Sequence, residues 1–280
     1  MRGEENKKWD IKKRLLACQV KMFFFNTNKQ DFALFFPPVC NFKILYSFAA
    51  MKKKINLKEY FKAMNLKFNN LNVRIFHFNI IRVNTLVCYD ETKNGVIVDP
   101  GMSSAEEQQM LLDFITKENI VIQYIINTHP HIDHVLGNAF CVTTFHAPLV
   151  AHEAGLSIYN NASNDATIFR FPHYNYPQPD IFINDNDMLT FGNQTWKIFY
   201  TPGHVDGSVC LYDEKNRFVV VGDVLFAGSI GRTDLPTGNF NLLIQNIKEK
   251  LLSLENDTLV IPGHAETTTI GDEKNNNPYL

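Results

Sequence analysis

The sequence predicts a mixed α/β fold in which two similar β-rich halves carry flanking helices. Short apolar runs of strand length recur from about Leu71 onward, and Gly, Pro, Asn or Asp bound them. Other segments in both halves place apolar residues at helical spacing. Four of the apolar runs end in a histidine or an aspartate, so we expect the strand ends to bring these polar side chains together at one edge.

The first half contains five expected strands and two expected helices. The strands are expected at Val73–Phe76, Thr85–Tyr89, Val96–Val98, Ile120–Ile126 and Leu149–Val150. The four residues from Ser104 to Glu107 match a capping box, which opens a helix with an apolar face that includes Leu111 and Ile115. A second, short helix is expected from about Val135 to Phe145.

The second half repeats this organisation after a polar, aromatic segment from Ser157 to Asp187. A segment of this length and composition predicts an irregular lid, binding loop or mobile loop, and its aromatic residues could line a substrate cleft or pack against one another at the surface. Strands are then expected at Thr195–Tyr200, Val209–Tyr212, Phe218–Val221 and Leu259–Ile261, and a helix from about Phe240 to Leu254.

Residues 1–63 differ in composition from the rest of the chain. Lys and Arg outnumber Asp and Glu there by 14 to 5 (+9), whereas the remainder has 13 against 24 (−11). We expect residues 1–63 to be a loosely attached or poorly ordered extension, with Met51 or Met64 as a native start, and residues 64–280 to form the main domain. A basic arm that binds a membrane surface or a partner is the alternative.

Composition also limits the cellular setting and the partners. The apolar stretch Phe32–Ala50 is interrupted by prolines, Asn41 and Lys43, which disfavours a membrane span, and no signal peptide is evident. The five cysteines are scattered and form no C-x-x-C pair, which indicates a reducing, cytoplasmic setting and disfavours a catalytic cysteine. The acidic main domain disfavours a nucleic-acid substrate, so a small-molecule substrate is expected.

The strongest chemical signal is the run from Thr128 to His134, which contains three histidines and one aspartate. Imidazole and carboxylate are common ligands of zinc and iron. In an extended segment, His129 and His131 can point to the same side. Three further candidates follow apolar runs later in the chain, each directly after a glycine: His204, Asp223 and His264. A glycine there permits a sharp turn without crowding the site.

These motifs resemble those of metallo-β-lactamase-fold hydrolases, specifically the short bacterial proteins of the glyoxalase II (hydroxyacylglutathione hydrolase) type. The resemblance covers about Leu71 to Leu280. It includes His129-x-His131-x-Asp133-His134, Pro202-Gly203-His204, Gly222-Asp223, Pro262-Gly263-His264, the stretch from Gly228 to Asp234 and the terminal Asn277-Pro278-Tyr279-Leu280. It implies an αββα sandwich, which agrees with the two expected halves.

The resemblance also implies a site for two divalent metal ions, with zinc expected and iron or manganese as alternatives. One ion would take His129, His131 and His204, the other would take Asp133, His134 and His264, and Asp223 would bridge them. Such a pair lowers the pKa of a shared water from about 15.7 towards 7 and provides hydroxide at neutral pH. The implied activity is attack of this metal-bound hydroxide on a thioester such as S-D-lactoylglutathione, with Asp133 and Asp223 as catalytic residues.

Several related activities stay open at this point. A persulfide dioxygenase is similar in fold but would use a single iron on His129, His204 and Asp223. Lactonases share the full ligand set, whereas a β-lactamase, a processing ribonuclease and a silent binding module are less favoured. Arg232 is the candidate for binding an anionic substrate, with an ion pair to Asp234 as the alternative. Only 16 residues follow His264, so the helical glutathione-binding domain of longer relatives has no counterpart.

Overall fold

The structure is a computed structural model that describes residues 24–26, 32–34, 64–169, 171 and 176–280. The chain divides into two compact units, Met1–Asn56 and Leu57–Leu280. In the first unit, β1 (Phe24–Asn26) pairs antiparallel with β2 (Phe32–Leu34). The other residues before Met64 lie outside the described part of the chain, so the expected loose attachment of residues 1–63 stays a prediction.

The second unit contains two large mixed sheets. The first sheet has seven strands in the order β3 (Met64–Lys67), β4 (Leu71–Phe78), β5 (Val83–Asp90), β6 (Asn94–Val98), β7 (Val121–Ile126), β8 (Leu149–Ala151) and β9 (Ile181–Phe182). The second has six strands in the order β10 (Met188–Phe191), β11 (Gln194–Tyr200), β12 (Val209–Asp213), β13 (Phe218–Gly222), β16 (Leu259–Pro262) and β17 (Thr268–Thr269). A small hairpin joins β14 (Leu225–Phe226) to β15 (Ser229–Ile230).

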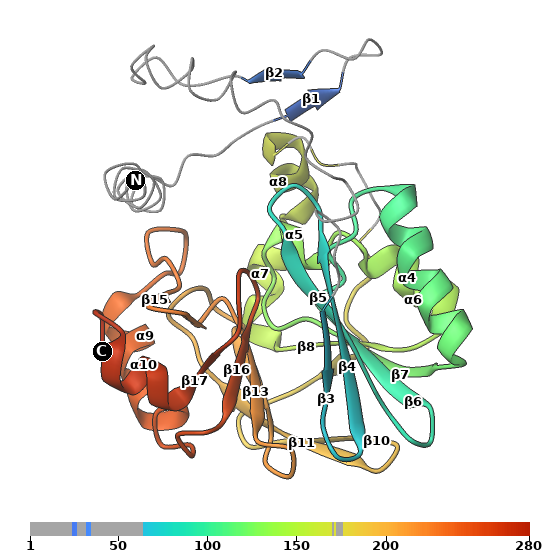
Figure 1. The fold of residues 1–280 in the computed structure, drawn as a ribbon. Helices are drawn as coiled ribbons and strands as arrows, with labels where there is room; N and C mark the ends of the chain where they lie inside the picture. Colours follow the sequence, from blue (N-terminus) through green and yellow to red (C-terminus); the bar gives the residue numbers. More distant parts are fainter. Residues whose placement is uncertain (1–23, 27–31, 35–63, 170, 172–175) are drawn as a thin grey trace, which may run out of the picture. The chain divides into compact units, whose positions relative to one another are not determined.

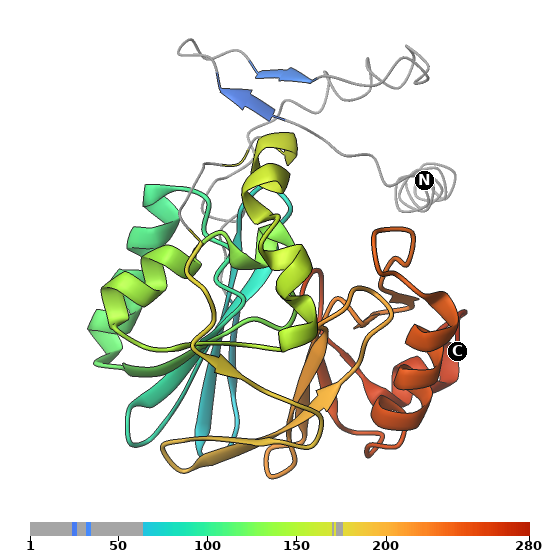
Figure 2. The same cartoon turned by 180° about the vertical axis from the view of Figure 1, so that it is seen from behind.

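Helices cover the outer face of each sheet (Figures 1 and 2). The first sheet carries α4 (Ala105–Glu118), α5 (Ile132–Val135), α6 (Asn138–Phe145), the 3-10 turn Glu153–Gly155, α7 (Leu156–Tyr159) and α8 (Ala162–Phe169). The second carries α9 (Phe240–Asn246), which continues into a π-helical turn at Ile247–Leu251, and α10 (Ile270–Asn276). The αββα sandwich implied by the resemblance is therefore confirmed. In the described part of the chain, no helix has the length and apolar character needed to cross a membrane.

Alternation along the strands explains the three layers of apolar packing. In β6, Val96 and Val98 point into the core between the sheets, whereas Ile97 points to the helices of the first sheet. In β13, Val220 lies between the sheets and Val219 packs against the helices of the second sheet. Strands that are apolar at every position are therefore buried on both faces, which is why they read as continuous apolar runs.

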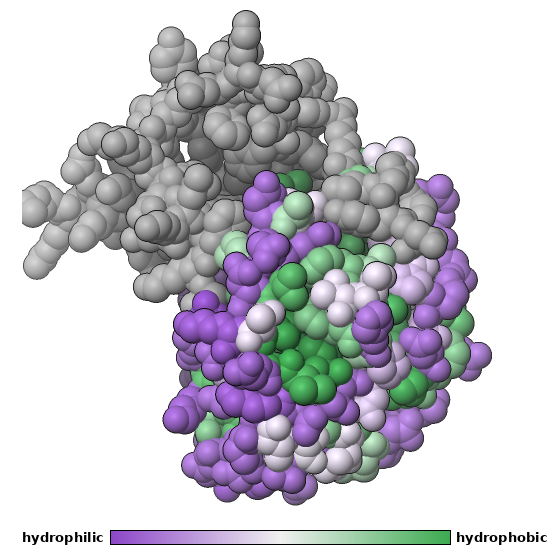
Figure 3. Space-filling view, turned by 90° about the vertical axis from the view of Figure 1, so that its right-hand side faces the viewer, coloured by the Kyte–Doolittle hydropathy of each residue, from purple (hydrophilic) through white to green (hydrophobic). Residues whose placement is uncertain are grey.

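The outer layer on the first sheet also leaves some apolar surface. Met110 and Phe114 of α4 and Phe140 and Phe145 of α6 are only partly buried where they pack against the core. Figure 3 views the side of the molecule that carries these two helices and shows an apolar area surrounded by hydrophilic residues.

The strand predictions are largely confirmed, but the prediction for Ser157–Asp187 is wrong in part. Two short helices and β9 form within that segment, because Tyr159, Ala162 and Ala166 are buried against the outer face of the first sheet. The predicted helix at Val135–Phe145 is interrupted between α5 and α6, where Gly137 approaches the backbone oxygen of Pro100. Packing against the sheet stabilises these elements, and this packing cannot be read from local sequence patterns.

The capping box is confirmed at Ser104 but differs in its second half. The Ser104 side chain accepts a hydrogen bond from the backbone N–H of Glu107, as expected. The Glu107 carboxylate does not return to Ser104. It instead accepts hydrogen bonds from the backbone N–H groups of Ser103 and Asn79, and so ties the start of α4 to the tip of the β4–β5 hairpin.

Trp196 is the largest fully buried side chain between the two sheets. Its indole Nε1–H donates to Oδ2 of Asp213 over 3.0 Å, and its ring meets Phe191 and Phe218 edge-on. We expect Trp196→Ala to lower the free energy of unfolding by about 3–5 kcal/mol, because it leaves a cavity and removes one of the hydrogen bonds to the buried Asp213 carboxylate. Urea unfolding measures this loss.

Thr195→Ala is the matched control, since Thr195 lies on the same strand with its side chain exposed. That change should stay within about 0.5 kcal/mol. Equal effects of the two substitutions would show that Trp196 does not hold the sheets together.

Candidate metal centre

The seven predicted ligands lie at the carboxyl ends of strands from both sheets. His129 and His131 follow β7, and Asp133 and His134 lie on the short helix α5 directly after them. His204, Asp223 and His264 follow β11, β13 and β16, respectively. The parallel pairs β6–β7 and β13–β16 place their carboxyl ends side by side, so one edge of the sandwich collects all these residues.

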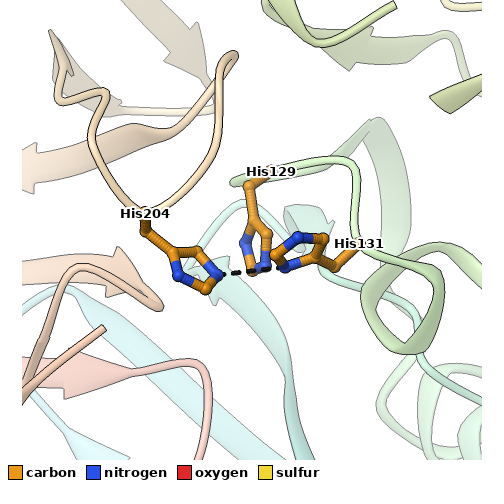
Figure 4. Close-up of side chains that lie close together, drawn as sticks. All are labelled: His129, His131 and His204. Carbon is orange, nitrogen blue, oxygen red and sulfur yellow. Dashed lines mark hydrogen bonds between the residues drawn. The ribbon is translucent and has the colours of Figure 1, made fainter. Parts of the chain in front are cut away.

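His129, His131 and His204 form the first group of donor atoms. Their ligand nitrogens all lie within 4.8 Å of one another. The Nε2 atom of His204 faces Nδ1 of His131 at 3.0 Å (Figure 4). Among the described residues, nothing hydrogen-bonds to the buried Nε2 atom of His129. Three imidazoles that converge in this way fit one metal ion.

Asp133, His134 and His264 form the second group, with ligand atoms also within 4.8 Å of one another. The Nε2 atoms of His134 and His264 are 3.2 Å apart, and Nε2 of His264 is 3.1 Å from Oδ2 of Asp133. The His134 side chain is fully buried, whereas those of Asp133 and His264 are partly exposed.

Asp223 lies between the two groups. Its Oδ1 atom is 3.6 Å from Nε2 of His134. Its Oδ2 atom is 3.8 Å from Nε2 of His204 and 3.7 Å from Nε2 of His264. Within the described part of the chain, Oδ1 is buried without a hydrogen-bond partner. A carboxylate in this place can contact two ions at once, as its predicted bridging role requires.

The chemistry of these side chains fits two divalent cations. Facing imidazole nitrogens at 3.0 and 3.2 Å can share a proton or can bind a common ion. The buried Nε2 of His129 and Oδ1 of Asp223 lack protein partners among the described residues, and a buried polar atom without a partner costs about 1–3 kcal/mol. Metal ligation would satisfy both atoms. The two clusters are therefore consistent with a dinuclear metal site.

Burial and charge act differently on the two groups. Burial, aided by neighbouring His204, lowers the pKa of His131 to about 4, so that ring is neutral and ready to bind a metal. Burial would also lower the pKa of His134, but the carboxylates of Asp133, Asp99 and Asp223 raise it to about 10. Without a cation the second group therefore holds a proton. A proton and a metal ion compete for the same negatively charged group of side chains, so the affinity for metal depends on pH.

Asp99, which directly follows the expected strand Val96–Val98, supports the site although no sequence motif marked it. Its Oδ2 atom lies 2.9 Å from Nδ1 of His134, opposite the nitrogen that faces the second group. The same carboxylate accepts hydrogen bonds from the backbone N–H and the hydroxyl of Thr128. It thus fixes the ring of His134 and the start of the motif. Its place at the end of β6, beside β7, is the signal that could have revealed it.

His204 is oriented by a backbone group rather than a side chain. Its Nδ1 atom lies 2.7 Å from the carbonyl oxygen of Arg232. The Arg232 guanidinium itself forms a bidentate ion pair with Asp234, with both N–O distances at 2.7 Å. The alternative of an ion pair is thus present in the structure, and the binding of an anionic substrate by Arg232 stays a prediction.

Glycines make close contact with the donor residues, as the sequence suggested. A Cβ atom on Gly263 would come within 2.3 Å of Oδ1 of Asp223, and one on Gly222 within 2.4 Å of the Thr128 hydroxyl. Gly222 also has a φ of +50°, a conformation that favours glycine. Any side chain at these two positions would displace the donor set.

We expect Asp99→Asn to weaken metal binding about 10- to 100-fold, because the neutral amide no longer supports the His134 imidazole with a charge. Asparagine tolerates the left-handed backbone at this position, where φ is +49°. Zinc titration against a chromophoric chelator measures the change. Asp113→Asn, an exposed change on α4, is the control, and equal affinities for the two variants would contradict the assigned role of Asp99.

The chain is similar in sequence to several curated proteins along most of their length. It is 32% identical to the hydroxyacylglutathione hydrolase GloC of Haemophilus influenzae, covering 75% of this chain and 98% of GloC. It is 33% identical to the probable metallo-hydrolase YqgX of Bacillus subtilis, covering 66% of this chain and 86% of that protein. An uncharacterized protein of Aquifex aeolicus is 35% identical over 74% of this chain and 96% of its own length.

Solved structures share the fold. The BLEG-1 B3 metallo-β-lactamase matches with a TM-score of 0.67 and 33% identity, over 74% of this chain and 99% of that one. TTHA1623, solved in a di-iron-bound form, matches with a TM-score of 0.66 and 32% identity, over 73% and 98% of the two chains. ETHE1 from Myxococcus xanthus, at 24% identity and a TM-score of 0.60, covers 78% of this chain and 83% of its own and shows the fold alone.

The family model of the metallo-β-lactamase superfamily matches residues 82–264. This range contains Asp99, the six residues of the two donor groups and Asp223. The resemblance drawn from the sequence motifs is thereby confirmed at the level of the family. The chain belongs to the metallo-β-lactamase superfamily and is a metal-dependent hydrolase of that fold.

Proposed function

We propose that the protein hydrolyses a thioester of a 2-hydroxy acid, such as S-D-lactoylglutathione, at a two-metal centre. The observation that carries the proposal is the position of Asp223, which faces both donor groups and so favours two ions over one. The similarity to GloC over 98% of its length supports the thioester as substrate. We propose zinc as the metal, and the iron in the related TTHA1623 structure makes metal analysis part of the test.

The protein side chains would hold the metals and orient the reactants. Bound as a pair, the two ions would lower the pKa of a water to near neutrality and polarise the substrate carbonyl. Asp133 and Asp223 are the carboxylates within the cluster, and we assign them to orienting the attacking water. Asp99 and the carbonyl oxygen of Arg232 keep His134 and His204 in place, so that the donor set needs little rearrangement when substrate binds.

A thioester suits a site of this composition. In the described part of the chain, the ionisable side chains gathered in the cluster are all candidate ligands or their supports, which leaves no separate acid to protonate a leaving group. A thiol with a pKa of about 8.5 can leave as a thiolate with little assistance, whereas an amine cannot. The acidic main domain argues for a small molecule rather than a nucleic acid or a membrane surface as partner.

Turnover and metal content measured on one purified sample test the proposal. The panel contains S-D-lactoylglutathione, other thioesters, an acyl-homoserine lactone, a β-lactam and glutathione persulfide. We expect two metal ions per chain and the highest kcat/KM on a 2-hydroxyacyl thioester. One iron per chain with oxygen uptake on the persulfide would establish the dioxygenase instead, and preference for the lactone or the β-lactam would reject the thioester.

Asp223→Ala should abolish both tight metal binding and hydrolysis, with kcat/KM lower by more than about 100-fold, because both donor groups lose a shared ligand. Metal analysis and thioester turnover on the same preparation check this. The control is Asp257→Ala, which removes an exposed carboxylate paired with Arg217. A fully metallated and active Asp223 variant would refute the bridging assignment.

Arg232→Gln tests the predicted contact with an anionic substrate. We expect KM to rise about 10- to 100-fold with little change in kcat, since a charge-assisted hydrogen bond contributes about 1.5–3 kcal/mol. The substitution keeps the backbone carbonyl that orients His204. Arg217→Gln is the matched control, because Arg217 also forms an ion pair with an aspartate. An unchanged KM in Arg232→Gln would reduce this arginine to a structural partner of Asp234.

A further inference from the structure

Asn84 connects the first sheet to the turn that carries His264. Asn84 lies on β5 and is buried, with 1% of its surface exposed. Its Nδ2 atom donates to the carbonyl oxygens of Pro262 and Ala265 at 2.9 and 3.0 Å. Its backbone N–H donates to the carbonyl oxygen of Gly263 at 2.7 Å. One residue of the first sheet therefore binds three of the four backbone carbonyls from Pro262 to Ala265.

His264 depends on its backbone for orientation more than His134 and His204 do, because the Nδ1 atoms of those two rings have partners. Nδ1 of His134 faces Asp99, and Nδ1 of His204 faces the carbonyl oxygen of Arg232. Nδ1 of His264 is buried and has no hydrogen-bond partner among the described residues. On the side of Nδ1, therefore, no hydrogen bond orients the His264 ring, and the backbone of the turn sets its direction there.

The backbone beside His264 is in an unfavourable conformation. Ala265 has a φ of +63°, in the left-handed region that is unfavourable for a residue with a Cβ atom. The hydrogen bond from Asn84 ends on the carbonyl of this same residue. Asn84 thus offsets the strain that turns the chain after His264 and keeps the imidazole directed at the second group.

The orientation of the Asn84 amide is fixed by a fourth contact. Its Oδ1 atom lies 2.7 Å from Nδ1 of His77. The carbonyl oxygens of Pro262 and Ala265 can only accept, so Oδ1 of Asn84 lies on the side of His77 and accepts from its Nδ1–H. The Nδ2 group of Asn84 therefore faces the two carbonyl oxygens and donates to both.

We propose that Asn84 is a positioning residue that sets the affinity of the second metal ion through His264. The proposal rests on the two-metal function proposed above. Asn84 contacts the 262–265 turn, which supplies one donor to the second group and none to the first. Loss of the Asn84 side chain should therefore weaken zinc binding by the second group and not by the first. A role confined to general stability would weaken both sites together or neither.

The test uses Asn84→Asp and Asn84→Ala in the full-length protein. Asn84→Asp keeps the size of the side chain but places an oxygen against the carbonyls of Pro262 and Ala265, so it cannot donate to either. The matched control is Asn216→Ala, which removes an amide with two side-chain hydrogen bonds, to Gln194 and Asp213, at the β12–β13 turn. Each protein is stripped of metal and titrated with zinc against a chromophoric chelator, and urea unfolding of the metal-free proteins is measured alongside.

We expect wild type and Asn216→Ala to bind two zinc ions tightly. Both Asn84 variants should bind the first zinc within about threefold of wild type and the second about 10- to 100-fold more weakly. Excess zinc should restore the thioester kcat of Asn84→Asp with little change in KM. If Asn84→Ala fails to fold, Asn84→Asp alone decides the question through the ratio of the two affinities.

Two outcomes would overturn the inference. One is a second-site affinity in Asn84→Asp equal to that of wild type, and the other is an equal weakening of both sites. The titration needs no substrate, so it also separates this inference from the proposed substrate. If the wild-type protein binds two zinc ions but hydrolyses no thioester, the proposed substrate is wrong. The titration would still decide the role of Asn84.

Discussion

Parallel strand pairing at one edge of the sandwich is the constraint on which the metal centre depends. Pairing of β6 with β7 and of β13 with β16 brings the residues after these strands side by side. The four strand ends deliver Asp99, His129, Asp223 and His264. Because each strand is buried on at least one face by a continuous apolar core, the ends cannot shift separately. Donor geometry is therefore a property of the packed sheets and not of any single loop.

The supports of the donors differ in kind, and this divides the site chemically. His134 is held by a carboxylate, His204 by a backbone carbonyl and His264 by the hydrogen-bonded turn around it. A carboxylate partner increases the basicity of the imidazole and the negative charge of the second group, whereas a carbonyl mainly fixes direction. The first group is a neutral cluster of histidines, and the second is rich in charge. From this difference we expect the two groups to bind a metal ion with unequal affinities.

Much of the fold and the donor set could be predicted from the sequence. The apolar runs are strands buried on both faces, so length and β-branched composition identify them despite the lack of alternation. The seven donor residues stand next to these runs in recognisable motifs. Asp99 and Asn84 were not predicted, because each acts through a partner that is distant in sequence. Asn84, for example, contacts carbonyls that lie 178 and 181 positions away. The helices within Ser157–Asp187 were missed because burial against the sheet, rather than a local pattern, stabilises them.

The order of the donors along the chain has a consequence for biosynthesis. His129, His131, Asp133 and His134 are translated first, and His264 follows His129 by 135 positions. At about 5–20 residues per second, roughly 7–27 seconds pass between these two residues on the ribosome. During that interval the four early ligands exist without His204, Asp223 or His264. The complete set of candidate ligands can therefore assemble only after the second sheet has been synthesised.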